Sequence, residues 1–246
     1  VVPEPEHLPT RLDAVCGVIY AIFTEGHTSS SGEGLLRGSL CDEAIFLAET
    51  LAGLLPDEGE ARGLAALCLL TDSRRLTRED DEGRPVLLPD QDRSRWDRGQ
   101  IDRGLRHLLA AHTSANTGSY ELQAAIAALH ATAATYADTD WRAIVTIYDT
   151  MLRSGAGPVV ALNRAAAIGE WQGPQAGLGA LDELDAGALD DYPYFHSARA
   201  ELLSRVGADA DAIGAYDRAI EHAGNDVQRS WLAERRDEAA ARIRSG

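Results

Sequence analysis

The feature that most constrains this chain is a helical spacing of apolar residues that recurs along almost its whole length. Apolar side chains spaced three and four residues apart share one face of an α-helix, and that face must be buried against a neighbouring element. The first two such stripes are Leu12, Val15, Cys16, Ile19 and Phe23, and then Leu40, Ala44, Leu47, Ala48, Leu51 and Leu55. Pro56 ends the second stripe, because proline cannot donate the backbone hydrogen bond that a helix interior needs.

Prolines also mark where later helices begin. Pro158, Pro174 and Pro193 each follow a glycine or an Asp-rich stretch, and proline is favoured in the first helical turn. From the stripes and start signals we expect about eleven helices and almost no strand. One segment departs from this pattern: residues 72–93 hold a run of charges, a Glu82-Gly83 turn signal and two prolines. We expect a small hairpin or loop insertion there, between two helices.

The helices also show signs of a repeat. In a tetratricopeptide repeat of ~34 residues, a small residue is followed by a large apolar residue four positions later and by alanine three positions after that. Ala212, Tyr216 and Ala219 follow this order, and weaker copies centre on Ala143 and Ala176. We therefore predict an all-α, superhelical stack of helix pairs that forms a single domain over residues 1–246. An irregular all-α domain without true repeats is the alternative.

The charged residues exclude several activities. The formal net charge is −16, from 39 acidic residues against 23 basic ones, and every basic residue is arginine. A phosphate-loop NTPase and a pyridoxal enzyme each need a lysine that this chain lacks, and we expect no cofactor. Such an acidic surface repels phosphate backbones, so we expect no direct nucleic-acid binding. No apolar run approaches the ~20 residues that cross a bilayer, so we expect no membrane contact.

The densest group of candidate binding residues runs from Asp90 to Arg98, where carboxylates alternate with arginines around Trp96. This mixture suits a catalytic acid or a ligand clamp. The structural alternative, which we favour residue by residue, is that Asp92 or Ser94 caps the next helix while Trp96 anchors that helix to the core.

Two further polar clusters are Glu25-Gly26-His27 and Asn163-Arg164. Histidine and cysteine spacings indicate no metal site, since His107 and His112 are five residues apart and the three cysteines form no close pair. The cysteine count also argues against a disulfide framework and favours a reducing compartment. Because no nucleophile motif such as GxSxG occurs, we expect that the chain is not an enzyme.

Six stretches, in order and nearly from end to end of the chain, resemble those of a known family. They are residues 18–27 (VIYAIFTEGH), 40–45 (LCDEAI), 90–96 (DQDRSRW), 120–128 (YELQAAIAA), 139–141 (TDW) with Tyr148-Asp149, and 158–165 (PVVALNRA). In these the chain resembles the tetratricopeptide-like C-terminal extension of one group of extracytoplasmic-function (ECF) RNA polymerase sigma factors. Thr24 and His27 stand where members of that group often have asparagine and tyrosine, so the chemistry of that loop differs.

The resemblance implies a regulatory, protein-interaction domain that modulates transcription initiation in the cytoplasm. Its partners would be the sigma core regions and RNA polymerase, with a regulatory protein or peptide as a further candidate. The DNA-binding sigma regions are absent from this chain, so we expect residues 1–9 to be a linker from regions upstream. A concave groove of stacked helices would hold the partner. The candidate groove residues are Glu25, Asp90, Asp92, Arg93, Trp96, Gln123, Trp141, Asn163 and Arg164.

Two other functions stay open at this point. The chain is a small-molecule sensor or enzyme if Asp90–Arg93 and Glu25–His27 build one polar pocket. It is a purely structural tail if it only stabilises the protein to which it is attached. A closed pocket of convergent charges favours the sensor, whereas a wide, open groove favours the interaction module.

Overall fold

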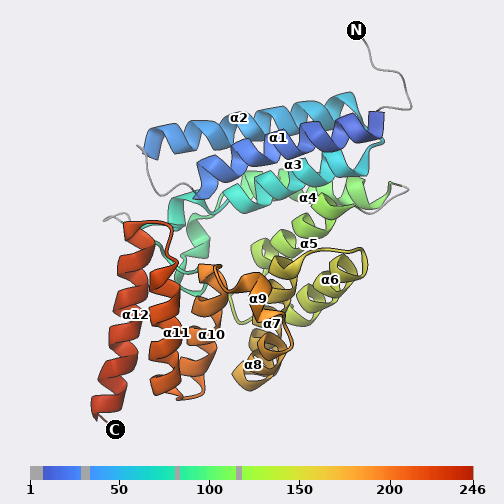
Figure 1. Cartoon of the computed structure of the whole chain (residues 1–246). Coiled ribbons are helices and arrows are strands. Elements are labelled where there is room, and N and C mark those ends of the chain that lie inside the picture. The colour runs from blue at the N-terminus through green and yellow to red at the C-terminus, as the bar shows by residue number, and fades with distance from the viewer. Residues whose placement is uncertain (1–7, 29–33, 81–83, 115–117, 246) are drawn as a thin grey trace. The chain divides into compact units, whose positions relative to one another are not determined.

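The computed structural model of this chain describes residues 8–28, 34–80, 84–114 and 118–245 (Figure 1). These residues form twelve α-helices and no strand longer than a single bridge, which confirms the all-α prediction. The chain divides into two compact units, residues 1–139 and 140–246, and each is described by itself. Of the expected linker, residues 1–7 lie outside the described residues, and α1 begins at Leu8.

Unit 1 is built around α3 (Gly59–Asp72), which packs against four other helices. Every residue from Leu64 to Leu70 is buried, because this stretch is apolar on all sides and has a neighbour on each. Gly63 allows the closest approach, since a Cβ atom there would lie 2.6 Å from the backbone nitrogen of Glu121. The surrounding helices are α1 (Leu8–Thr28), α2 (Gly34–Leu54), α4 (Arg98–His112) and α5 (Ser119–Thr132).

The predicted stripes are mostly buried, with two differences at their edges. Leu12, Cys16, Ile19 and Phe23 belong to the core of unit 1, whereas Val15 is 45% exposed. Leu40, the first residue of the second predicted stripe, is also exposed. Within unit 1, α1 packs mainly against α2 and α3, with Tyr20 also touching Tyr120 of α5, so it buries a narrower stripe than its apolar residues suggest.

The segment predicted as a hairpin is an irregular connection between α3 and α4. It contains the 3₁₀ turns η2 (Arg75–Thr77), η3 (Leu88–Asp90) and η4 (Arg93–Arg95). Pairing is limited to one antiparallel bridge between Glu79 and Pro85, with the Val86 nitrogen donating to the Arg78 carbonyl at 2.8 Å. Residues Arg75–Thr77 form a 3₁₀ turn and not one strand of a hairpin, because Arg75 turns back to bind Asp72. The predicted Glu82-Gly83 turn lies outside the described residues.

Unit 2 is a series of helices in which each long helix packs mainly on the next. Its helices are α6 (Trp141–Arg153), α7 (Pro158–Gln172), α8 (Pro174–Asp182), the short α9 (Ala186–Leu189), α10 (Pro193–Arg205), α11 (Asp209–Glu221) and α12 (Asp226–Ser245). The three prolines begin α7, α8 and α10 as predicted. Ala143, Ala176 and Ala212, the repeated small residues, lie in α6, α8 and α11. This order of packing is typical of stacked helix pairs.

No helix in the described part of the chain has both the length and the apolar character that crossing a membrane requires.

Candidate functional site

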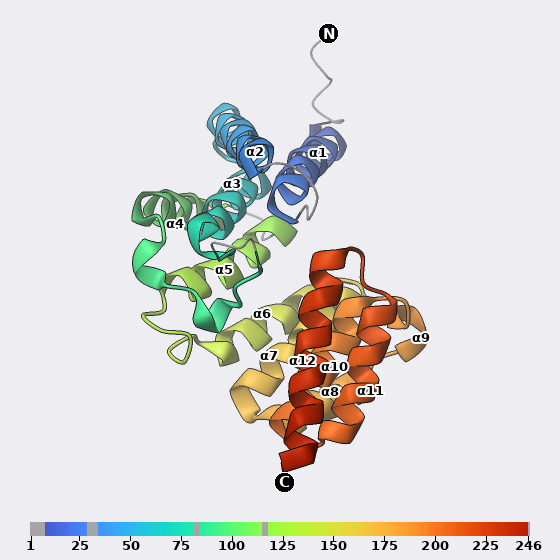
Figure 2. The same ribbon diagram turned by 90° about the vertical axis from the view of Figure 1, so that its left-hand side faces the viewer.

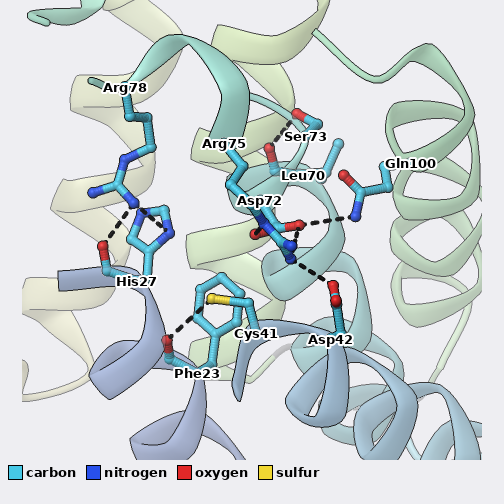
Figure 3. Close-up of polar contacts among 10 residues, drawn as sticks. All are labelled: Phe23, His27, Cys41, Asp42, Leu70, Asp72, Ser73, Arg75, Arg78 and Gln100. Atoms are coloured by element: carbon cyan, nitrogen blue, oxygen red, sulfur yellow. Dashed lines mark hydrogen bonds and ion pairs between the residues drawn. The ribbon is translucent and has the colours of Figure 1, made fainter. Parts of the chain in front are cut away.

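The described residues of unit 1 contain a group of polar side chains, most of them buried or half-buried, where α1, α2, α3, α4 and η2 meet. We call it the Asp72 cluster, and Figure 3 shows how its members lie. It consists of His27, Cys41, Asp42, Asp72, Arg75, Arg78 and Gln100. Helix α3 ends at Asp72, so its carboxylate stands at the border between the apolar core and the polar connection that follows.

Asp72 is the centre of this cluster and is only 2% exposed. The guanidinium group of Arg75 binds both of its carboxylate oxygens, with Nε at 2.8 Å and Nη2 at 2.7 Å. Gln100 adds a donor from α4 at 2.9 Å. Arg75 also reaches Asp42 of α2, 2.7 Å away, so one arginine connects α2 to the end of α3. A buried carboxylate with this many donors is fully satisfied.

His27 and Arg78 form the second contact of the cluster, at the end of α1. Arg78 Nη1 lies 2.8 Å from His27 Nδ1 and donates to the His27 carbonyl at 2.7 Å. Because a guanidinium group only donates, Nδ1 must be the acceptor, and the proton of the neutral ring is on Nε2. Burial, reinforced by the neighbouring arginines, lowers the pKa of His27 to about 3. The ring therefore stays neutral across the physiological range.

Cys41 completes the cluster from α2. Its thiol is 2% exposed and points to the carbonyl of Phe23 in α1, with the sulfur 3.9 Å from the oxygen. Burial raises the pKa of this thiol to about 11, so it is not a thiolate at neutral pH. Cys41 thus joins two helices as a small apolar side chain with a weak donor.

The donor atoms of His27, Cys41 and Asp72 lie within 4.8 Å of one another, which is the spacing of a three-ligand metal site. Their present partners argue against that use. Both Asp72 oxygens already accept from Arg75, and His27 Nδ1 accepts from Arg78. A metal ion would have to displace these bonds beside two positive charges. The prediction that the chain binds no metal stays a prediction.

The cluster is also poorly suited to acid–base or nucleophilic chemistry. A general base needs a pKa near the working pH, and His27 is far below it. A cysteine nucleophile needs a lowered pKa, and that of Cys41 is raised. The adjoining pocket measures only about 100 Å³, well under the usual ~300 Å³ of a small-molecule site. Its lining includes Gly26 and His27 but none of residues 90–93, which the sensor hypothesis placed beside them.

The segment predicted as a ligand clamp forms contacts within the fold. Asp92 accepts from the backbone nitrogen of Ser94 at 3.0 Å and caps η4, while Trp96 is 3% exposed and donates to Thr77. Arg93 lies over the ring of Trp96. It also donates to the carbonyls of His130 and Ala133, where α5 ends. These contacts agree with the structural alternative for Trp96. For Asp92 they agree only in part, because Asp92 caps the 3₁₀ turn η4, whereas Asp97 caps the next helix, α4, by accepting from the backbone nitrogen of Gln100 at 2.9 Å.

Arg93 also lies near His130, a residue in the last turn of α5. A histidine in the last helical turn suits the helix dipole when it is charged. Burial, together with the nearby Arg74 and Arg93, instead lowers the pKa of His130 to about 4. The positive charge at this helix end therefore comes from Arg93.

The remaining predicted residues are spread over both units. Glu25 and Asp90 are exposed in unit 1, and Gln123 of α5 bonds only to Ser119, one turn earlier. In unit 2, Arg164 binds Asp149 at 2.6 Å, Asn163 is exposed, and Trp141 is the half-buried first residue of α6. The proposed groove that would join all nine residues stays a prediction.

Sequence analysis missed most of the Asp72 cluster, including its central pair. From the sequence, Asp72 and Arg75 are predicted only to belong to the charged insertion at residues 72–93. A signal was present: a carboxylate directly ends the apolar run that becomes α3, and an arginine follows three residues later. Buried charges of that kind are nearly always paired.

The Asp72 cluster lies within the part of the chain that is similar to a known protein family. Residues 11–112 match the model of a family of unknown function, DUF6596. The chain is also similar to an uncharacterized protein of Rhizobium meliloti (strain 1021), with 40% identity over 239 residues. The aligned part is 97% of this chain but 56% of that protein. The chain therefore spans little more than half the length of this relative.

Proposed function

We propose that this chain is the regulatory, protein-interaction C-terminal domain of an ECF-type RNA polymerase sigma factor and that it modulates transcription initiation in the cytoplasm. The observation that carries the proposal is the alignment with the longer relative. Nearly all of this chain, both units included, matches about half of a larger protein. That is expected of a domain attached to further regions, as the family resemblance implies.

Exposed apolar residues on α2 support a protein partner. Phe46 is 62% exposed and Leu54 is 73% exposed. Eight residues apart, they lie on one side of the helix, two turns from each other. Large apolar side chains at the surface often mark interaction sites, and aromatic residues supply much of the binding energy there. We assign this surface to the sigma core regions of the same polypeptide.

The net charge of −16 supports the same kind of partner. An acidic surface is attracted to arginine- and lysine-rich protein surfaces, such as those that bind DNA, and speeds encounter with them. The domain would thus contact the basic part of the protein without contacting DNA.

Transcription in vitro by the full-length protein tests the proposal. We expect deletion of the domain to change promoter-dependent transcript levels several-fold, and Phe46→Asp to reproduce much of that change. Ile243→Asp, at a residue of unit 2 that is 50% exposed, is the matched control and should have no effect. Unchanged transcription by a stable protein without the domain would contradict the proposal. So would a gene that encodes no sigma regions upstream of Val1.

A further inference from the structure

A second group of charged residues in unit 1 lines a pocket between α2, α3 and α4. Figure 2 shows the ribbons of these three helices, with α3 between the other two. We call it the arginine pocket. It is lined by Glu49 of α2, Arg62 of α3, and Arg103, Arg106 and His107 of α4. Its volume is about 280 Å³, close to the lower end of the range of small-molecule sites, ~300–1,000 Å³. The pocket thus has room for a small ligand.

The charge of this pocket is opposite to that of the whole chain. Three arginines face a single carboxylate, Glu49, in a protein whose net charge is −16. Like charges gathered around one cavity repel one another, and solvent screens part of this repulsion because Arg106 is exposed and the Arg103 side chain is 43% exposed. Glu49 compensates for only one of the three positive charges.

Most hydrogen-bond donors of the pocket have no protein acceptor among the residues that the structure describes. Arg62 uses its Nε to bind the carbonyl of Pro56 at 2.7 Å, and Arg103 uses its Nε to bind Glu49 at 3.2 Å. Within the described part of the chain, the terminal nitrogens of these two guanidinium groups donate to no other residue, and Arg106 has no hydrogen-bond or ion-pair partner. The ε nitrogens fix the two groups in place, and the forked terminal N–H groups stay available.

His107 supplies a second, independent sign of an unfilled site. Its Nδ1 is buried and has no hydrogen-bond partner among the described residues, while its Nε2 lies 3.7 Å from Glu49. Burial is the main cause that lowers the pKa of this ring, opposed by Glu49. A buried polar atom without a partner is uncommon in a native protein and is often explained by a bound water or ion.

We propose that the arginine pocket binds a small molecule through an oxyanion, a phosphate or a carboxylate group, held by the terminal N–H groups of Arg62, Arg103 and Arg106. Guanidinium groups bind such oxygens in pairs, with charge-assisted hydrogen bonds. Glu49 orients Arg103 and at the same time repels the ligand, which limits its affinity. The proposal does not rest on the sigma-factor function; it adds a ligand to the domain.

Isothermal titration of the whole chain at low ionic strength tests the proposal, with inorganic phosphate in one arm and succinate in the other. We expect one or both anions to bind at millimolar concentrations or below. Arg103→Gln and Arg106→Gln should each weaken binding about tenfold, through the loss of charge-assisted hydrogen bonds. Arg153→Gln, at an exposed arginine of α6, is the matched control and should leave binding unchanged.

Glu49→Gln is the most informative variant, because it should tighten binding about fivefold by removing one nearby negative charge. A purely structural role for these residues would not produce tighter binding. The proposal is overturned if neither anion binds the wild-type chain at 10 mM (roughly the weak limit of a specific site). It is also overturned if the control weakens binding as much as the pocket variants, or if Glu49→Gln weakens it.

Discussion

The Asp72 cluster and the arginine pocket use the same residue types within one unit, and they differ in how many acceptors each contains. In the cluster, Arg75 is shared by two carboxylates, and Gln100 binds the buried one as well. In the pocket, three arginines surround Glu49 alone. The arginine donors of the cluster are therefore matched by acceptors within the cluster, whereas the pocket contains more donors than acceptors. From this comparison we expect a polar group whose donors have matching acceptors to be a structural contact, and one with unmatched donors to bind a ligand.

The largest expected effect comes from removing the buried charge of the cluster. We expect Asp72→Ala to lower the free energy of unfolding by about 3 kcal/mol, since it leaves Arg75 without its buried partner. Asp42→Ala removes the exposed partner of the same arginine and should cost less than about 1 kcal/mol. Urea unfolding at pH 7 measures both. Equal losses would show that burial does not distinguish the two carboxylates.

Acid should destabilise the cluster through His27. The folded-state pKa is about 3, below the ordinary 6.5, so the unfolded chain takes up the proton first. Stability is therefore present above pH 6.5 and is lost as the pH falls from there towards 3. The loss should amount to about 1.4 kcal/mol per pH unit from this residue, or about 2 kcal/mol between pH 6.5 and 5.

Unfolding curves at several pH values measure this effect. His27→Gln should flatten the dependence on pH, and His130, whose pKa is lowered to about 4, contributes a second share. The stability of a variant with glutamine at both His27 and His130 should then depend least on pH. If neither single variant changes the slope of the free energy of unfolding against pH, then burial and the nearby arginines do not keep the two rings neutral in the folded protein.

The pocket arginines should matter little for stability, in contrast to Arg75. We expect Arg103→Gln and Arg106→Gln to change the free energy of unfolding by no more than about 0.5 kcal/mol, as is usual for exposed positions outside a network. The same urea experiment measures it. A loss of about 2 kcal/mol would make the pocket a second structural contact and remove the difference between the two regions.

The smallest signal is expected from the thiols. Burial raises the pKa of Cys41 and of Cys16 to about 11, and Cys68 is buried as well. All three should react slowly with a thiol reagent at pH 8 in the folded protein and rapidly in urea. Fast labelling of Cys41 without denaturant would show that the cluster opens in the native state.

Local features of the fold were predictable because the signals that encode them are local. The spacing of apolar residues predicted the helices, and Pro158, Pro174 and Pro193 predicted three of their starts. The prediction of which apolar residues are buried was weaker, because burial depends on whether a neighbouring helix covers that part of the helix surface. Val15 lies on an apolar stripe and is nevertheless 45% exposed, because α1 packs mainly against α2 and α3 and these cover only part of its apolar face.

The candidate sites were less predictable, because they join residues far apart in the chain. Arg75 meets Asp42 across 33 positions, and Arg78 meets His27 across 51. Arg103 meets Glu49 across 54 positions. Sequence patterns report which face of a helix is apolar and cannot tell which polar ends meet. Asp92 and Trp96 were the exceptions, since a cap and a buried tryptophan depend on their own segment.

The sequence alone determined that this chain is helical, where three of its helices begin, that its net charge is strongly negative and that lysine chemistry is excluded. Only the tertiary structure decided which arginines are satisfied. Arg75 ends beside two carboxylates, and Arg62, Arg103 and Arg106 end around one. The physical reason is that helix formation depends on neighbours three and four residues away, whereas charge pairing depends on how the finished helices pack.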